Sequence, residues 1–240
     1  MMALGRIYEQ GIAVKQDISK ALAYYDHAAQ DMEPYAIYKI GYFLEEGVHP
    51  DCNNRKPNRE LAFQYYSEAF TQGEFQNQAS REALFKRGQY FQFGFGVSER
   101  NFQQAIKNYD LAAADGHVES MNALGSLYFK DLREYEQASQ WFKKASDRGY
   151  TRAINNLGIC YEFGYGVEKD FNEALLLYEE GAIKGHVQSM YNLAYLYFQL
   201  ALENSTISER KSPQIRHNEQ FKLASHWFRK CLLKIDSINA

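Results

Sequence analysis

Small and large apolar residues alternate along this chain at a spacing that predicts helices. Ala21, Tyr24, Tyr25 and Ala28 lie at i, i+3, i+4 and i+7, which places them on one face of a helix. Rings on such a face can enter the spaces that small residues leave on a neighbouring helix. The same spacing recurs at Ala62, Tyr65, Tyr66, Ala69; at Ala138, Trp141, Phe142, Ala145; and at Ala224, Trp227, Phe228, Cys231.

A second helical pattern precedes these segments and carries a glycine on its apolar face. In the clearest copy, Ala153, Leu157, Gly158 and Tyr161 share one face. Gly158 leaves room for a helix that crosses closely, and Tyr161 can fill the adjoining gap with a large ring. Each pattern therefore predicts one helix of a packed pair.

The residues between the two patterns have the chemistry of a tight connection. Gly164 and Gly166 can end the first helix and turn the chain, because glycine adopts left-handed backbone angles without steric cost. Asp170 then has the chemistry of an N-cap for the second helix. Asp17 and Asn101 occupy the same position in other copies.

The glycine of the first helix marks a repeat that runs along the whole chain. The intervals between successive anchors are 36, 47, 37, 33 and 36 residues, and a period of this length indicates an array of helix pairs. The five anchor glycines, and the alanine that replaces the sixth, are Gly5, Gly41, Gly88, Gly125, Gly158 and Ala194.

The combined pattern, Ala-x-x-x-Leu-Gly-x-x-Tyr-x-x-Gly-x-Gly-Val-x-x-Asp-x-x-x-Ala-x-x-x-Tyr, resembles the Sel-1-like repeat, a relative of the tetratricopeptide repeat. The copies at 151–185 and 79–115 match closely, whereas copy four has Asp131 to Glu134 in place of the Gly-x-Gly-Val loop. We therefore predict one all-α, right-handed superhelical solenoid of about twelve helices and no sheet over residues 1–240. The repeats are expected at approximately 1–31, 32–75, 79–115, 117–149, 150–185 and 186–235.

Two inserts interrupt this period, near residues 49–58 and 203–218. The second is polar and contains Pro213, so we expect an exposed loop from Glu203 to Asn218. Ser212, next to Pro213, matches a short kinase-site pattern in this insert.

Charge and cysteine content narrow the class of protein. The 27 basic and 30 acidic residues give a net charge of −3, which argues against a general nucleic-acid binder. Cys52, Cys160 and Cys231 lie in different copies, so we expect reduced thiols and a cytoplasmic or nuclear location rather than the secretory lumen. No apolar run is long enough to span a membrane, and no signal peptide precedes the first copy, so we expect no membrane insertion.

The residue types that carry catalysis or bind metals are better explained by the repeat. His117 and His186 are 69 residues apart, which is two repeat steps, so we interpret them as one turn in two copies. Gly94–Gly96 and Gly164–Gly166 lack the third glycine, the preceding strand and the Lys-Ser/Thr pair of a phosphate loop. Cys160 has no histidine or acid placed to activate it. We expect no enzyme activity, no metal and no cofactor.

The resemblance also implies a binding surface, because in such arrays the first helix of each pair lines a concave face. Aromatic and amide side chains dominate the positions that point there, which is the composition of a groove for a protein or peptide. Several of these rings, Phe93 and Phe163 especially, could instead pack against the neighbouring repeat. The predicted partner-binding residues are Tyr38, Tyr42, Phe85, Gln89, Asn122, Phe129, Asn155, Glu162, Tyr191, Tyr195 and Phe198.

The function that the resemblance implies is protein–protein interaction. Proteins with similar repeats act as adaptors and scaffolds of multiprotein complexes. The alternative is a permanent structural subunit of a large complex, whose partner chains would cover the inserts and the ends of the array. Both interpretations predict protein partners and no nucleic-acid partner.

Overall fold

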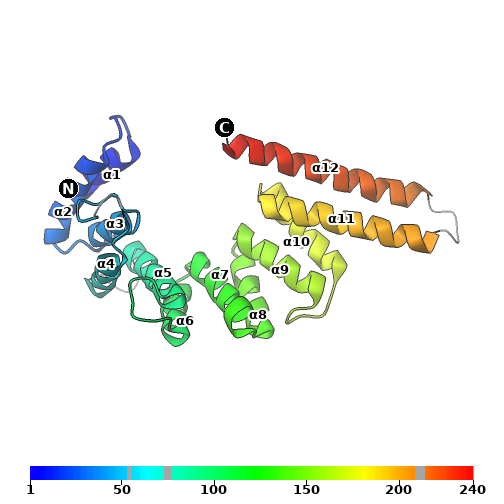
Figure 1. The fold of residues 1–240 in the computed structure, drawn as a ribbon, viewed down its shortest axis with the longest axis horizontal. Coiled ribbons are helices and arrows are strands. Elements are labelled where there is room, and N and C mark those ends of the chain that lie inside the picture. Colours follow the sequence, from blue (N-terminus) through cyan, green and yellow to red (C-terminus); the bar gives the residue numbers. More distant parts are fainter. Residues whose placement is uncertain (53–55, 73–76, 209–213, 240) are drawn as a thin grey trace. The chain divides into compact units, whose positions relative to one another are not determined.

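A computed structural model describes residues 1–52, 56–72, 77–208 and 214–239 of the chain. Over these ranges the chain forms twelve α-helices and no strand (Figure 1). The predicted all-α array of helix pairs is confirmed.

The chain divides into two compact units, Met1–Leu127 and Tyr128–Ala240. We call the odd-numbered helices A helices and the even-numbered ones B helices. The first unit contains α1 (Met2–Gln10), α2 (Ile18–Gln30), α3 (Pro34–Glu45), α4 (Arg59–Gln72), α5 (Gln78–Phe93), α6 (Phe102–Ala114) and α7 (Val118–Leu127). The second contains the π-helical turn η2 (Tyr128–Leu132), α8 (Tyr135–Ser146), α9 (Thr151–Phe163), α10 (Phe171–Ile183), α11 (Val187–Ser208) and α12 (Gln214–Asn239).

The helices begin and end where the cap chemistry predicts. The side chain of Asp170 accepts hydrogen bonds from the backbone N–H groups of Asn172 and Glu173 at the start of α10. Asp17 and Asn101 cap α2 and α6 in the same way. Gly164 ends α9 in the left-handed region, at φ 76°.

The second glycine of the loop has a different role, which is close packing between repeats. A Cβ atom on Gly166 would collide with the backbone carbonyl of Tyr135, at the start of the preceding B helix. Gly96 lies in the same way against the carbonyl of Arg59. The Gly-x-Gly pair therefore combines a helix terminator with a contact that admits no side chain.

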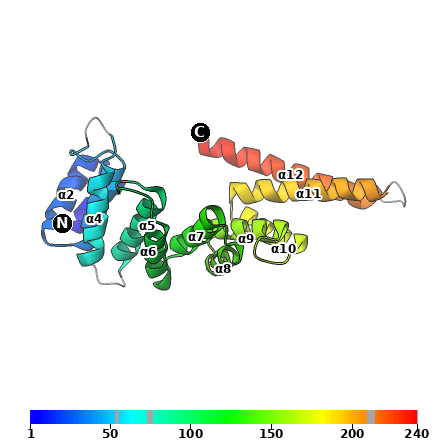
Figure 2. The same cartoon turned by 60° about the horizontal axis from the view of Figure 1, so that its bottom comes forward.

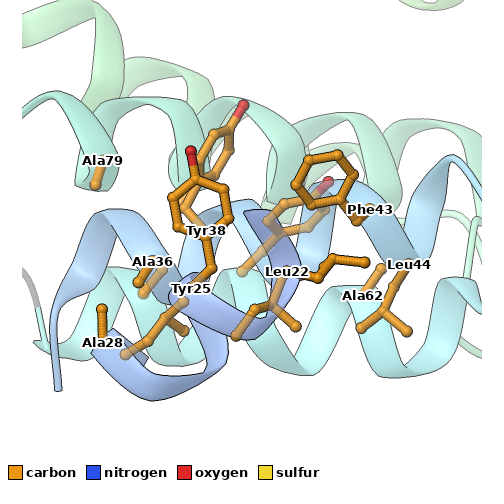
Figure 3. Close-up of a cluster of buried hydrophobic side chains, with 14 of the residues drawn as sticks. Leu22, Tyr25, Ala28, Ala36, Tyr38, Phe43, Leu44, Ala62 and Ala79 are labelled. Carbon is orange, nitrogen blue, oxygen red and sulfur yellow. The ribbon is translucent and has the colours of Figure 1, made fainter. Parts of the chain in front are cut away.

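The core of four repeats is built from B-helix tyrosine rings that lie on the A-helix glycines Gly5, Gly41, Gly88 and Gly158. A Cβ atom on Gly158 would lie 2.6 Å from Cε1 of Tyr178, and one on Gly5 would lie 2.7 Å from Cε1 of Tyr25. These rings are fully buried. Figure 3 shows Tyr25 within the buried cluster of the first unit, among side chains from α2, α3 and α4. Gly158 is thus a packing residue, as the sequence predicts.

The expected loop from Glu203 to Asn218 is wrong over most of its length. Helix α11 continues to Ser208 and α12 begins at Gln214, so the two form a long hairpin (Figure 2). Ser212, the residue of the kinase-site pattern, lies outside the described residues.

We predict that Gly158→Ala lowers the free energy of unfolding. At an unobstructed helical site this change stabilises by about 0.5–1 kcal/mol, because glycine loses more backbone entropy on folding. Here the new methyl group would overlap the buried Tyr178 ring, and overpacking costs about 1–3 kcal/mol. Chemical denaturation measures the sign directly. A more stable Gly158→Ala variant would show that the ring does not lie on this glycine.

Candidate functional site

A hydrogen bond from a buried tyrosine joins the two helices of four repeats. In each, a B-helix tyrosine donates its hydroxyl to the residue four positions after the anchor glycine of the A helix. The donor–acceptor distances are 2.6 Å for Tyr25–Glu9, 2.7 Å for Tyr66–Glu45, 2.9 Å for Tyr109–Gln92 and 2.6 Å for Tyr178–Glu162. A buried hydroxyl needs such a partner, because leaving it unpaired costs about 1–3 kcal/mol.

The other two repeats change both members of this pair together. Copy four has Phe129 at the acceptor position and Phe142 at the donor position, and their ring centroids lie 6.3 Å apart. Copy six has Phe198 and Phe228 at the same positions. Where the hydroxyl is absent, the polar acceptor is absent too, so the positions act as one unit.

In the first unit, each of the two glutamate acceptors pairs with a lysine from the following repeat. Lys39, two residues before Gly41, forms a salt bridge with Glu9. Lys86, two residues before Gly88, lies 2.7 Å from Glu45. Each lysine also lies near an aromatic ring, that of Tyr42, at 4.9 Å and 5.9 Å respectively.

The carboxyl group of Glu162 lacks this arrangement. The equivalent position of the following repeat is Asn192, whose side chain donates to Asn155 at 3.0 Å. Among the described residues, no lysine or arginine forms a salt bridge with Glu162. Burial raises its pKa, and the Tyr178 hydroxyl and the charge of Lys169 oppose that rise without cancelling it. Burial and the bond to Glu162 also raise the pKa of Tyr178.

His117 and His186 occupy the same turn in two copies, as the sequence predicts, and each caps the helix that follows. Nδ1 of His117 accepts the backbone N–H of Ser120 and lies 2.9 Å from its hydroxyl oxygen. His186 and Ser189 repeat this geometry at the start of α11. The Ser189 hydroxyl also donates to Asn155, which ties α11 to α9.

Three predicted partner-binding residues are buried, so they do not lie on an open surface as expected. Tyr38, Asn155 and Glu162 are 9%, 3% and 6% exposed. Tyr38 packs on Tyr66 within the first core cluster (Figure 3), and burial raises its pKa. Asn155 and Glu162 bond to α11 and α10. Tyr38 and Glu162 join the two helices of one repeat, whereas Asn155 joins its repeat to the next.

Five predicted residues are half-buried, and three of them have clear ring contacts. Tyr42 lies beside Lys39. Phe85 contacts the rings of Tyr109 and His117, at 5.9 and 5.2 Å. Phe129 joins an aromatic cluster with Tyr135 and Tyr165, each at 5.2 Å. The half-buried set is Tyr42, Phe85, Gln89, Asn122 and Phe129.

The remaining three predicted residues lie together on α11 and are partly exposed, with Tyr191 and Phe198 also in contact with the α12 rings Phe228 and Phe221. Tyr191, Tyr195 and Phe198 are 46%, 42% and 38% exposed, and Leu202, one turn further, is 45% exposed. Their spacing of i, i+4, i+7 and i+11 places them on one face. The rings of Tyr191 and Tyr195 stack, with centroids 6.2 Å apart and planes 5° apart. We call these four residues the α11 stripe.

Phe93 and Phe163, named above as candidates for packing between repeats, are also exposed. Each contacts the ring in its own loop, Phe95 at 5.5 Å and Tyr165 at 5.8 Å. The lysines at the inter-repeat salt bridges were not predicted. The signal that could have found them is a glutamate four residues after one anchor glycine and a lysine two residues before the next.

The described residues offer little chemistry beyond these contacts. Cys52, Cys160 and Cys231 are free and buried, and burial raises the pKa of the Cys160 thiol to about 12. Within the described ranges, no three His, Cys, Asp or Glu side chains are placed to hold a metal ion. None of the described helices is long and apolar enough to cross a membrane.

We predict that Glu162→Gln gains stability relative to wild type as the pH rises. Because burial raises the pKa of Glu162 in the folded state, its favourable contribution is complete below the ordinary carboxyl pKa. That contribution is lost as the pH rises through the raised pKa. Glutamine keeps an acceptor for Tyr178, as Gln92 does for Tyr109. Urea denaturation from pH ~4 to ~8 measures the difference.

Glu45→Gln is the matched control, because Glu45 has a lysine partner. Losing that salt bridge should destabilise the protein near neutral pH. Equal responses of the Glu162→Gln and Glu45→Gln variants would contradict the distinction between the two sites.

The Sel1 repeat family model matches residues 1–31, 34–74, 81–117, 118–150, 151–186 and 187–201. The chain is also similar to the DAP3-binding cell death enhancer 1 of Rattus norvegicus, with 38% identity over 42% of this chain and 20% of that protein. It is 33% identical to the ERAD-associated E3 ubiquitin-protein ligase component HRD3 of Candida glabrata, over 36% of this chain and 10% of that one. The chain thus spans a fifth or less of these relatives.

Solved structures share the fold. A Sel1 repeat protein from Oxalobacter formigenes superposes with a TM-score of 0.74 at 21% identity, over 96% of this chain and 83% of that one. A protective antigen of uropathogenic Escherichia coli with an SLR fold gives 0.72 at 25% identity, over 97% and 45%. Because the family model matches most of the chain, in all six copies, this protein belongs to the Sel1 repeat family.

Proposed function

We propose that this chain is a non-enzymatic protein–protein interaction module, an adaptor or scaffold, that binds a protein partner through the α11 stripe. The observation that carries the proposal is the exposure of Tyr191, Tyr195, Phe198 and Leu202 on one face. Contiguous exposed apolar side chains mark interaction sites, and tyrosine is enriched among residues that dominate binding energy. The stacked Tyr191–Tyr195 pair presents two rings with little rotamer freedom left to lose.

Family membership supports the same function. Relatives of this chain are named for binding DAP3 and for a place in an E3 ubiquitin-protein ligase. Those names describe whole proteins of which this chain matches a small part, so their partners and pathways do not carry over to this chain. The relatives support the broader class of function, in which Sel1 repeats take part in protein–protein interactions.

The chemistry of the described residues supports a binding role rather than catalysis. The Cys160 thiol is buried with a raised pKa, so little nucleophilic thiolate is present. His117 and His186 are engaged in helix caps. The three free cysteines support a cytoplasmic or nuclear location, where thiols stay reduced.

A permanent structural subunit of a large complex is the second candidate. The observation that favours it is the exposure of Leu232, Leu233 and Ile238 on α12, each more than half exposed. Large apolar side chains of this kind are usually covered in permanent assemblies.

We predict that the double variant Tyr191→Ala/Tyr195→Ala loses partner capture while it stays folded, with some loss of stability from the lost contact between Tyr191 and Phe228. Truncating a binding hot spot costs about 2 kcal/mol or more, a loss of roughly thirtyfold in affinity. Quantitative mass spectrometry of proteins captured from native extract measures the effect. Leu176→Ala/Ile183→Ala, on exposed positions of α10, is the matched control and should capture normally. Normal capture by the tyrosine variant would contradict the assignment of the stripe.

Oligomeric state separates the two candidates. A transient adaptor should remain monomeric without partners, and light scattering should give the mass of one chain, 27.9 kDa. Self-association that Leu232→Ser/Leu233→Ser abolishes would favour the permanent subunit, because those side chains would then be the surface that a partner normally covers.

A further inference from the structure

Three repeats of this chain pair a buried tyrosine with a glutamate, and two of the three complete the pair with a lysine. Lys39 serves Glu9 and Lys86 serves Glu45, each from two residues before the next anchor glycine. In the repeat that follows the uncharged Gln92, the lysine position is occupied by Ala123. The lysine is therefore absent where the acceptor carries no charge. Within this scheme Glu162 is the exception: it keeps the carboxylate and the tyrosine but has Asn192 at the lysine position.

The repeat after Glu162 has a tyrosine at the position that Tyr42 holds beside Lys39. In the first unit, the Lys39 ammonium lies 4.9 Å from the ring of Tyr42, the residue after its own anchor glycine. Tyr195 is the residue after the corresponding anchor, Ala194, and it is exposed. Helix α11 is held against α9 by the bonds from Ser189 and Asn192 to Asn155. The acidic and aromatic members of the site are therefore both supplied by the second unit.

We propose that Glu162 and Tyr195 form a receptor for one lysine side chain of a protein partner, which takes the place that Lys39 and Lys86 occupy in the first unit. The inference rests on the proposed function, because it assumes a partner on the α11 stripe. The partner's ammonium group pairs with the Glu162 carboxylate and its alkyl stem lies along Tyr195. Apolar residues beside that lysine cover Tyr191, Phe198 and Leu202.

Charge and shape together select lysine. The side chains of Lys39 and Lys86 are 13% and 19% exposed, so the position encloses a long stem and admits a compact charge at its end. A buried carboxylate with a raised pKa gains a partner when an ammonium group arrives. Lys169 of this chain acts on Glu162 only through its charge, and its ammonium lies 4.4 Å from the ring of Phe171.

Two substitutions isolate the site, and the chain itself supplies the precedent for each. Glu162→Gln removes the charge and keeps the acceptor for Tyr178, as in the Gln92 repeat. Asn192→Lys supplies the missing lysine from within, as in the Lys39 and Lys86 repeats. Asn192→Met is the matched control, because it also loses the bond to Asn155 but adds no charge.

The first measurement is stability, which needs no partner. Urea denaturation of the full chain should show that Asn192→Lys is more stable than Asn192→Met. The advantage should vanish when both are made in the E162Q background. An advantage that is absent, or that persists with E162Q, would mean that this position does not place a cation at Glu162, and the receptor would be rejected.

The second measurement is ligand preference. The probes are two pools of eleven-residue peptides with random flanks free of Lys and Arg, and with either lysine or norleucine at the centre. Wild type should bind the lysine pool about tenfold more tightly, which corresponds to about 1.4 kcal/mol. The preference should fall to near unity in E162Q and N192K and persist in N192M. Equal binding of the pools by wild type, or a preference that E162Q retains, would overturn the proposal.

The two proposals fail separately. If the Tyr191→Ala/Tyr195→Ala variant loses its native partner but wild type shows no lysine preference, the stripe binds partners and the lysine receptor is wrong. If that variant captures its partners normally while E162Q abolishes the lysine preference, Glu162 binds lysine without Tyr195, and both the stripe assignment and the role of Tyr195 are wrong.

Discussion

A tyrosine ring lying on a glycine is the contact from which the rest of each full repeat follows. The ring can approach the A helix only where Cβ is absent, as the short distances at Gly5, Gly41 and Gly158 show. The approach buries the whole ring, including its hydroxyl, which then needs an acceptor. A residue one helical turn after the glycine is in place to provide it. When that acceptor is a carboxylate, its own burial favours a cation from the next repeat. The absence of one Cβ atom thus leads, step by step, to a salt bridge between repeats.

The deviating repeats show that these steps are linked. Phe142 has no hydroxyl, and the acceptor position opposite it holds the apolar Phe129. Copy six has Phe228 and Phe198 at the two positions, and its anchor is Ala194 rather than glycine. No acid is left without its hydroxyl donor in any of the six copies. The repeats therefore differ by coordinated changes of a contact, and not by independent drift at single positions.

The fold was predictable from sequence because its determinants are local. Spacing of small and aromatic residues defined the helices, and Asp17, Asn101 and Asp170 marked their starts. The site was less predictable. The family pattern assigned Glu162 to a groove, but four residues after Gly158 the side chain faces Tyr178 on the B helix. The spacing of residues along one helix does not tell which neighbouring helix such a side chain will face. The extension of α11 to Ser208 was also missed, because tertiary context can override a local break in the repeat period.

Glu162 differs from the other two glutamate acceptors, Glu9 and Glu45, because it has no lysine partner within the described part of the chain. A buried carboxylate with a raised pKa lowers stability near neutral pH, and Gln92 shows that an uncharged residue can accept the same hydrogen bond. Stability alone therefore gives no reason for a glutamate at this position. Local rules are broken most often at functional sites, where the cost to folding is offset by binding. The next repeat carries the half-exposed Tyr191–Tyr195 pair on α11, so the missing cation and these rings belong to successive repeats of one unit. A partner that supplies both a lysine and apolar side chains would remove both irregularities at once.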